Sequence, residues 1–270
     1  MNWKYFYASV KGTSHIANGT KKQDNCKVCE LNIKECTYLV CAVADGAGSA
    51  KYSDLSSNFI CKLFVKKTKK WLENNFLEDL TRDIIAEWFV HFQNVIKRAV
   101  QLYKLESVRD FATTLLFSIL NKNSNIFIQI GDGIIAIDNK DSLEAVFIPQ
   151  NGEYLNTTRF ATESDAINIF MFKRISEPIK RMAMHTDGIE QIAFNYREKQ
   201  PFEAFFVPFY GAMKKSDKIG CLETLSKQLE LFLESDRVNK KTDDDKTLVL
   251  ALSTDIENIS IQEEIHNECK

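Results

Sequence analysis

The sequence predicts an α+β protein in which helices cover β-sheets. Three features of the 270-residue chain favour this fold class. Strand-like stretches open the chain, two long helical stretches follow, and short, regularly spaced strands come next. Two more helical stretches and a last strand complete the order.

The strands are predicted from alternating or continuous apolar side chains bounded by Asn, Asp, Gly or Pro. The middle group, from "ATTLLFSIL" to "EAVFIP", indicates an antiparallel meander. The predicted strands are residues 3–10, 25–33, 36–44, 112–120, 125–131, 133–138, 144–149, about 167–172, 180–186 and 246–253. The polar residues 150–165 and the charged stretch 238–246 are predicted to be loops.

The helices are predicted from apolar side chains at helical spacing. Ser53 or Asp54 can cap the first helix, which runs to about Asn75. Its apolar positions are Leu55, Phe59, Leu63 and Phe64. The second long helix covers about 81–105, and its apolar face consists of Ile84, Ile85, Trp88, Phe89, Phe92, Ile96 and Val100. Two further helices are predicted near 201–213 and 219–235.

The amino-acid composition limits the classes of function to consider. Hydrophobic residues make up 44% and charged residues 27%, which is ordinary for a globular protein. The net charge of −2 offers no bulk attraction for nucleic acid or an anionic membrane, and neither is expected as a partner. No apolar run approaches the roughly 18–20 residues that span a bilayer, and no signal peptide is evident, so a cytoplasmic protein is predicted.

The seven cysteines form no disulfide framework and suit reduced thiols. Four of them could be written as a zinc quartet: Cys26, Cys29, Cys36 and Cys41. Zinc ligands usually sit on tight turns, whereas Cys26 and Cys41 fall within predicted strands. Small buried side chains on strands are therefore favoured over structural zinc.

Aspartates recur at the ends of predicted strands. Asp45, Asp132 and Asp187 each have a neighbouring glycine, and the run 243–245 precedes the last strand. One Asp-Gly pair is typical of a plain turn. If the strands lie side by side, however, several carboxylates converge, which is unfavourable unless a cation neutralises them. Oxygen-rich sites of this kind suit Mg²⁺ or Mn²⁺, so a di-metal carboxylate site competes with scattered turns as the interpretation.

Six short motifs in this order resemble those of the metal-dependent protein phosphatases, the type 2C serine/threonine phosphatases or PPM family. They are "QDN" (23–25), "VADGAG" (43–48), "FATTL" (111–115), "IGDG" (130–133), "HTDG" (185–188) and "DDDKT" (243–247). The N-terminal "GTSHIANGTKKQDN" resembles a bacterial branch of that family. The resemblance implies a four-layer α-β-β-α sandwich of two antiparallel sheets flanked by helix pairs. It also implies a phosphatase domain at 1–255 and a C-terminal tail at 256–270.

The resemblance implies a site for two or three Mg²⁺ or Mn²⁺ ions. Asp45 would bridge two ions, and the carbonyl of Gly46 would bind one of them. Asp187 and Asp244 would bind the other, and Asp132 matches a position that helps to hold a third ion. In the run 243–245, family spacing selects Asp244 as the ligand.

Further roles follow from the same resemblance. Asp24 would act through metal-bound water, and Thr113 and Thr114 would pack beside the site. Water activated by two ions about 4 Å apart would attack phosphorus directly, with no phosphoenzyme. The resemblance implies a phosphoserine or phosphothreonine protein as the substrate, and a cognate Ser/Thr kinase or its targets as the linked partner.

Two departures from the family pattern affect the chemistry. Ala47 stands where many members carry a histidine that protonates the leaving oxygen. No arginine precedes Asp24 to hold the phosphate; the segment offers His15, Lys21 and Lys22, of which His15 is the best candidate for a role in the site.

Of the other histidines, His185 is expected in the core or behind the ligands. His91 and His266 are expected to be incidental.

Two alternatives to an active phosphatase remain. A catalytically weak or inactive regulatory module could use the same fold. A metal-dependent nuclease is disfavoured because the sequence lacks a basic face.

Overall fold

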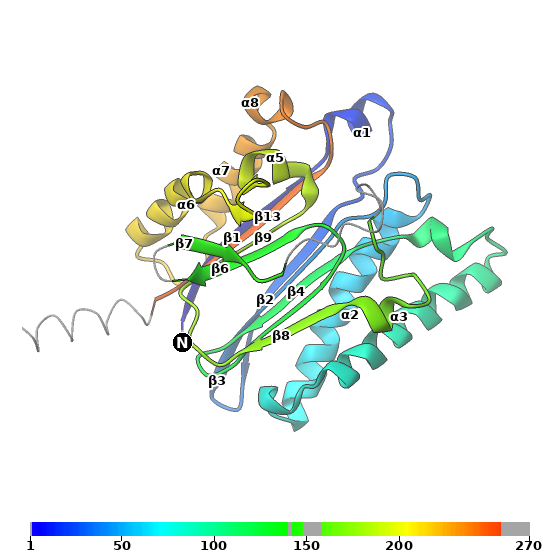
Figure 1. Ribbon diagram of the computed structural model, residues 1–270, viewed down its shortest axis with the longest axis horizontal. Helices are drawn as coiled ribbons and strands as arrows, with labels where there is room; N and C mark the ends of the chain where they lie inside the picture. Colours follow the sequence, from blue (N-terminus) through cyan, green and yellow to red (C-terminus); the bar gives the residue numbers. More distant parts are fainter. Residues whose placement is uncertain (1, 140–141, 148–157, 255–270) are drawn as a thin grey trace, which may run out of the picture.

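Two β-sheets pack face to face and carry helices on their outer faces (Figure 1). The computed structural model describes residues 2–139, 142–147 and 158–254. The first sheet has the order β12 (Gly220–Cys221), β1 (Trp3–Val10), β13 (Lys246–Ser253), β9 (Arg181–His185), β6 (Ile134–Asn139) and β7 (Ser142–Ala145). The second has the order β2 (Asn25–Ile33), β3 (Cys36–Ala44), β4 (Leu115–Leu120), β5 (Asn125–Ile130) and β8 (Met171–Ile175).

A pair of long helices covers each outer face. The helices α2 (Ser53–Asn74) and α3 (Arg82–Leu102) lie on the β2–β8 sheet, and α6 (Glu203–Lys215) and α7 (Glu223–Leu233) lie on the other (Figure 1). The predicted α-β-β-α fold class is therefore confirmed. One strand pair departs from it, because the short β12 runs parallel to β1.

Apolar side chains fill all three spaces between these layers. Between the sheets lie Trp3, Leu39, Phe127, Met184 and Val249, all fully buried. This explains why the central strands have nearly continuous apolar sequences: both of their faces are covered.

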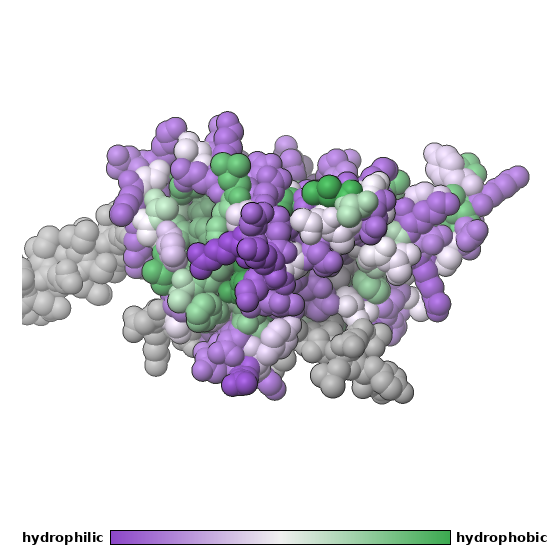
Figure 2. Space-filling view, turned by 90° about the horizontal axis from the view of Figure 1, so that it is seen from above, coloured by the Kyte–Doolittle hydropathy of each residue, from purple (hydrophilic) through white to green (hydrophobic). Residues whose placement is uncertain are grey.

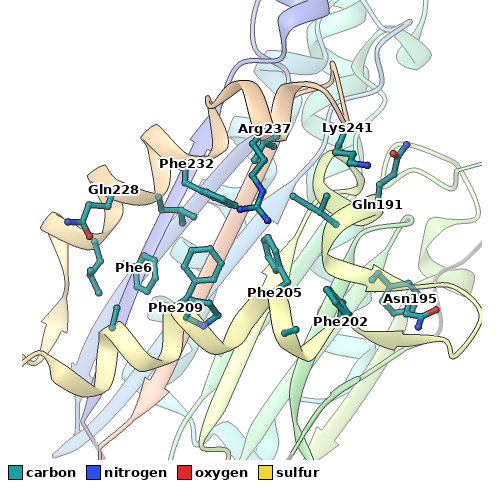
Figure 3. A pocket seen from close by; sticks show the side chains of 18 of the residues that line it. Phe6, Gln191, Asn195, Phe202, Phe205, Phe209, Gln228, Phe232, Arg237 and Lys241 are labelled. Carbon is teal, nitrogen blue, oxygen red and sulfur yellow. The ribbon is translucent and has the colours of Figure 1, made fainter.

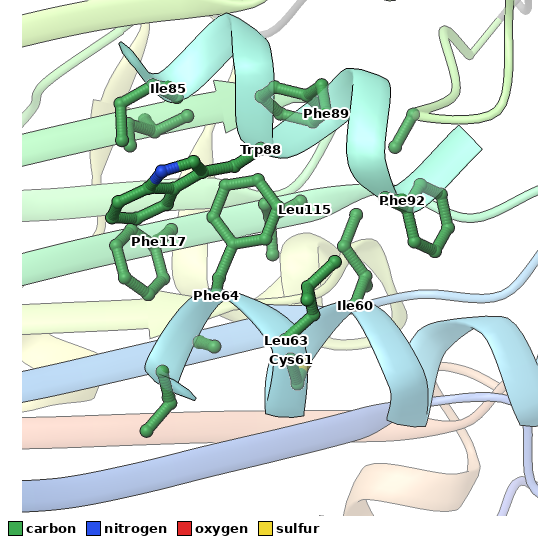
Figure 4. Close-up of a cluster of buried hydrophobic side chains, with 14 of the residues drawn as sticks. Ile60, Cys61, Leu63, Phe64, Ile85, Trp88, Phe89, Phe92, Leu115 and Phe117 are labelled. Atoms are coloured by element: carbon green, nitrogen blue, oxygen red, sulfur yellow. The ribbon is translucent and has the colours of Figure 1, made fainter. Parts of the chain in front are cut away.

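The α2–α3 layer is built around aromatic rings (Figure 4). Phe64 of α2 meets Trp88 and Phe89 of α3 and Phe117 of β4, with ring centroids 5.0–5.7 Å apart in edge-on geometry. Such pairs add about 0.5–1.5 kcal/mol to the free energy gained by burying each ring. The predicted apolar stripe of α2 is wrong at Leu55, which is 52% exposed.

Several predicted boundaries need correction. Residues 166–169 form the short helix α4 (Ala166–Ile169) ahead of β8, where one strand at 167–172 was expected. A continuous apolar run does not distinguish a buried helix from a buried strand, which explains the error. The strand expected at 144–149 is β7, displaced toward the N-terminus, and residues 148–149 lie outside the described residues.

The ends of the helices also differ from the predictions. Tyr52 precedes α2 and provides no side-chain cap, so the expected capping by Ser53 or Asp54 is wrong. Cys221 belongs to β12 instead of the start of α7, and the charged stretch 238–246 begins inside the helix α8 (Asp236–Asn239). The first half of the loop 150–165, the tail 256–270 and His266 lie outside the described residues.

Candidate active site

The predicted aspartates gather at one end of the two stacked sheets. In the β2–β8 sheet, Asn25 at the start of β2 pairs with Ala44 at the end of β3, so Asp24 and Asp45 leave the same edge. In the other sheet Leu248 of β13 pairs with His185 of β9, which places the residues before β13 beside those after β9. Sheet register therefore brings Asp24 close to Asp45 in one sheet, and the segment before β13 close to the turn after β9 in the other.

Asp24 links the two sheets. Its side chain is 1% exposed, and Oδ2 accepts hydrogen bonds from the hydroxyls of Thr186 (2.8 Å) and Thr247 (2.7 Å). Burial raises its pKa to about 7, Asp245 and Asp187 add to the rise, and the two hydroxyls oppose it. The sequence predicted Asp24, and both threonines fall within motifs noted there, but nothing in the sequence assigned them as partners of Asp24.

Asp45 is fixed through its backbone. Its N–H donates to Thr114 Oγ1 (2.9 Å), and its carbonyl accepts from Thr113 Oγ1 (2.9 Å) and Thr114 N–H (2.8 Å). Gly46 continues this contact by bridging to Thr113 and packs closely on Ser53. The two threonines therefore lie beside the site, as expected.

The carboxylates raise each other's pKa values. Burial raises the pKa of Asp45 well above its ordinary value, and Asp24, Asp187 and Asp244 add to the shift. Burial and Asp132 likewise raise the pKa of Asp187 to about 6, against a hydrogen bond with Asp45. The shifts therefore combine burial, which is the largest cause, with the convergence of like charges.

Asp245 serves as an anchor for the N-terminal loop. Its Oδ1 accepts from Gly12 N–H (2.7 Å) and lies 2.9 Å from His15 Nδ1. Its Oδ2 accepts from the backbone N–H groups of Gln23 (2.5 Å) and Asp24 (3.2 Å). Only 2% of Asp245 is exposed, and both of its carboxylate oxygens accept hydrogen bonds from the N-terminal loop.

The neighbouring Asp244 makes fewer hydrogen bonds than Asp245. It is exposed, and one oxygen accepts from Asp245 N–H (2.7 Å). Partial burial of the carboxyl group and the charge of Asp245 raise its pKa. Of the three aspartates before β13, it is the one that both faces the other carboxylates and keeps oxygens available.

Asp132 lies in the turn between β5 and β6, near Asp187. Its Oδ2 accepts a hydrogen bond of 2.5 Å from Thr158 Oγ1. Gly131 has φ +112°, a region that favours glycine, and a Cβ there would lie 2.5 Å from Thr114 Cγ2. The turn that carries Asp132 is thus packed directly on the motif that fixes Asp45.

Glu190, in α5 (Glu190–Ala193), is a residue that the sequence interpretation missed. Burial raises its pKa to about 7; its hydrogen bond with Tyr196 opposes the shift, and the nearby charges of Asp187 and Asp132 add to it. An acidic residue three positions after the aspartate of an Asp-Gly pair was the available signal.

A divalent cation fits this donor set. Oxygen ligands dominate, and their raised pKa values show negative charge that a cation would neutralise. No three His, Cys, Asp or Glu side chains among the described residues already form a metal-binding cluster. Mg²⁺ commonly uses one or two carboxylates and completes its coordination with water, which suits such a site.

The remaining candidates lie around this centre. His15 bonds to Asp245, Lys21 forms an exposed ion pair with Asp54 (3.0 Å), and Lys22 donates to Ser9. His185 is a buried core residue that stacks on Phe206, and burial lowers its pKa to about 4.

The four cysteines considered for zinc are spread along the β2–β3 hairpin. Cys41 is buried, Cys26 and Cys29 are half-buried, and Cys36 is exposed.

Comparison with known proteins agrees with this architecture. Residues 11–234 match the family model described as Protein phosphatase 2C. Serine/threonine-protein phosphatase 3 of Escherichia coli (strain K12) is 33% identical over 254 residues, covering 93% of this chain and 99% of that protein. The chain belongs to the protein phosphatase 2C family, and the predicted enzyme class, a protein serine/threonine phosphatase, is confirmed.

Solved structures share the fold. Serine/threonine phosphatase Stp1 from Staphylococcus aureus aligns with a TM-score of 0.61 at 14% identity, covering 92% of this chain and 94% of that chain. The catalytic domain of PstP, in complex with two manganese ions, aligns with a TM-score of 0.61 at 14% identity, covering 93% and 98%. Among the helices of the described residues, none is long and apolar enough to cross a membrane.

Proposed function

We propose that this chain is a metal-dependent phosphatase that removes phosphate from phosphoserine and phosphothreonine in proteins. The observation that carries the proposal is the convergence of Asp24, Asp45, Asp187 and Asp244, whose pKa values are all raised by burial and by neighbouring carboxylates. Relatives in complex with magnesium or two manganese ions support Mg²⁺ or Mn²⁺ as the cofactor.

Five groups would hold the ions. We assign two ions to the carboxylates of Asp45, Asp187 and Asp244 with the Gly46 carbonyl, and a third to the neighbourhood of Asp132. When bound, the ions supply Lewis acidity, which makes water a competent nucleophile near neutral pH.

The chain's own residues orient this centre. Asp24 is held by two threonine hydroxyls, which leaves Oδ1 free to accept a proton or a hydrogen bond from a water at the site. Asp245 fixes the loop 12–24 that carries His15, and His15 is our candidate for a polar contact with the phosphate. Ala47 cannot donate a proton, so the leaving oxygen must receive its proton from water or another residue.

We further propose a phosphorylated protein as the substrate, a Ser/Thr kinase or its targets as the linked partners, and the cytoplasm as the location. The domain boundary at residue 255 also remains a proposal. In its favour, β13 lies between β1 and β9 and must belong to the same domain.

The test is hydrolysis of a phosphothreonine peptide and of p-nitrophenyl phosphate in Mg²⁺ and in Mn²⁺. We expect metal-dependent turnover that falls at least about 100-fold in Asp45→Ala. The proposal is rejected if the parent protein turns over substrate no faster than Asp45→Ala in Mg²⁺ and in Mn²⁺. If calorimetry then still showed Mn²⁺ binding, the alternative of a regulatory module, which Ala47 favours, would replace it.

A further inference from the structure

A groove of about 890 Å³ lies between α6 and α7, on the outer face of the first sheet (Figure 3). Its floor includes Phe6 of β1, and its walls include Phe205 and Phe209 of α6 and Phe232 of α7. Hydrophobic residues also gather in a hollow on this face of an otherwise hydrophilic surface (Figure 2). A volume of this size is typical of small-molecule sites.

The two ends of the groove differ in chemistry. Ala212, Leu225 and Leu229 line one end, where the polar Gln228 is exposed to solvent. The other end carries Gln191, Asn195, Arg197 and Lys241 beside the aromatic side chains of Phe194, Tyr196 and Phe202, and Arg237 reaches in between the two ends (Figure 3). Along α6 the lining runs from Phe202 to Ala212, about 15 Å at the rise of an α-helix.

Two cations of the groove, Arg237 and Lys241, lack a partner among the described residues. The side chains of Arg237 and Lys241 form no ion pair or hydrogen bond within residues 2–139, 142–147 and 158–254. No Asp or Glu lines the groove in that part of the chain. Arg237 points inward toward the aromatic rings of Phe205 and Phe232 (Figure 3). A ligand with an anionic group beside Arg237 and Lys241 would complement both cations.

The apolar end favours a hydrocarbon chain over a peptide. Side chains such as Ala212, Leu229 and Phe209 offer no hydrogen-bond donor or acceptor. Peptide amides placed there would lose water without gaining partners, which is costly, whereas methylene groups lose nothing. The groove therefore suits a molecule that is apolar along its length and anionic at one end.

We propose that this groove binds a long-chain carboxylate, with its acyl chain between α6 and α7 and its carboxylate at Arg237 and Lys241. The carboxylate end lies against Gln191 and Ile192 of α5. This short helix begins three residues after Asp187. The charge of Asp187 contributes to the raised pKa of Glu190, the first residue of the helix. The groove is thus separate from the carboxylate centre, but helix α5 contributes residues to both.

The direct test is calorimetric titration of the metal-free, full-length chain with octanoate, decanoate and laurate. We expect saturable binding at one site, with affinity rising about fourfold for each added methylene. Arg237→Gln/Lys241→Gln should weaken laurate binding at least tenfold, and Ala212→Trp should abolish it by filling the apolar end. Lys97→Gln, an exposed cation on α3, is the matched control and should bind as the parent does.

Two further measurements keep the result specific. Dodecyltrimethylammonium, with a chain of similar length and the opposite charge, should bind at least tenfold more weakly than laurate. Laurate should slow hydrogen exchange at residues 188–197 in the parent and not in Ala212→Trp, with circular dichroism confirming that both remain folded. Absence of saturable laurate binding, equal binding of the cation, or unchanged binding by Ala212→Trp would each overturn the proposal. All these tests are independent of phosphatase activity.

Discussion

Two adjacent aspartates before β13 have different surroundings. Asp245 receives hydrogen bonds from three backbone N–H groups, whereas Asp244 is exposed and faces the other carboxylates. Substituting each one should therefore have a different consequence.

Asp245→Ala should lower the free energy of unfolding by about 2–4 kcal/mol, because it leaves buried donors without an acceptor. Asp244→Ala should leave stability within about 0.5 kcal/mol and weaken Mn²⁺ binding at least tenfold. Chemical denaturation and calorimetry measure the two quantities. The reverse assignment would be correct if Asp245→Ala stayed stable and lost the metal. Substitution of the exposed Asp243 by alanine is the control for the loss of one negative charge.

Thr158 orients Asp132 through a short hydrogen bond. Thr158→Val should weaken the weakest of the bound Mn²⁺ ions while sparing the tighter ones, and Thr158→Ser should restore it by returning the hydroxyl. Manganese titration followed by electron paramagnetic resonance counts the ions. Identical titrations of the valine variant and the parent would show that Thr158 does not position Asp132.

At the scale of elements, the site depends on close approach between the turn after β9 and the segment before β13. A Cβ on Gly188 would overlap the backbone oxygen of Asp245, so this position has no room for a side chain. Gly211, inside α6, has nothing within 4 Å of the equivalent atom.

Gly188→Ala should therefore destabilise the fold by about 3 kcal/mol or more through forced separation of the two segments. Gly211→Ala should be neutral or stabilising by up to about 1 kcal/mol, because alanine is the better helix former. Thermal and denaturant unfolding of this matched pair provides the comparison. Equal stability of the two variants would mean that the two segments separate easily.

Element type was predictable where the periodicity was long and clean. The helices α2 and α3 and the strands β1, β2, β3 and β13 lie within a few residues of their predicted bounds. The short elements α1 (Thr13–Ala17), α5 and α8 were missed. Each is only four or five residues long, and helices of that length depend on tertiary contacts instead of sequence periodicity.

The site was partly predictable for a related reason. Strand ends are visible in sequence, so Asp45, Asp132 and Asp187 could be singled out. The partners that fix them could not, because Thr186, Thr247 and Thr158 meet the aspartates only through sheet register and loop packing. The aromatic groove was likewise invisible, since its lining comes from β1, α5, α6, α7 and α8 together.

At the scale of the whole molecule, the clustered carboxylates make stability depend on pH. In the metal-free protein the pKa values of Asp24 and Asp187 are raised to about 7 and 6, so between pH 5 and 8 the folded state binds more protons than the unfolded state. Their contribution to stability is then present at low pH and is lost as pH rises through those values. Each proton released costs up to about 1.4 kcal/mol per pH unit.

We therefore expect the free energy of unfolding of the metal-free protein to fall from pH 5 to pH 8. Saturating Mn²⁺ should reverse this trend, because the cation stabilises the deprotonated carboxylates. Urea denaturation across this range, with and without metal, measures both. A metal-free stability that rises steadily to pH 8 would contradict the proposed electrostatics.

The central claim is that the two sheets bring these carboxylates together to bind divalent ions. Calorimetric titration with Mn²⁺ of the parent and of Asp45→Asn tests it most directly, since asparagine keeps the size and removes the charge. We predict at least two bound ions in the parent, and in the variant loss of one or a 100-fold weaker affinity, with a melting temperature at least as high. Equal stoichiometry and affinity in the two proteins would contradict the claim.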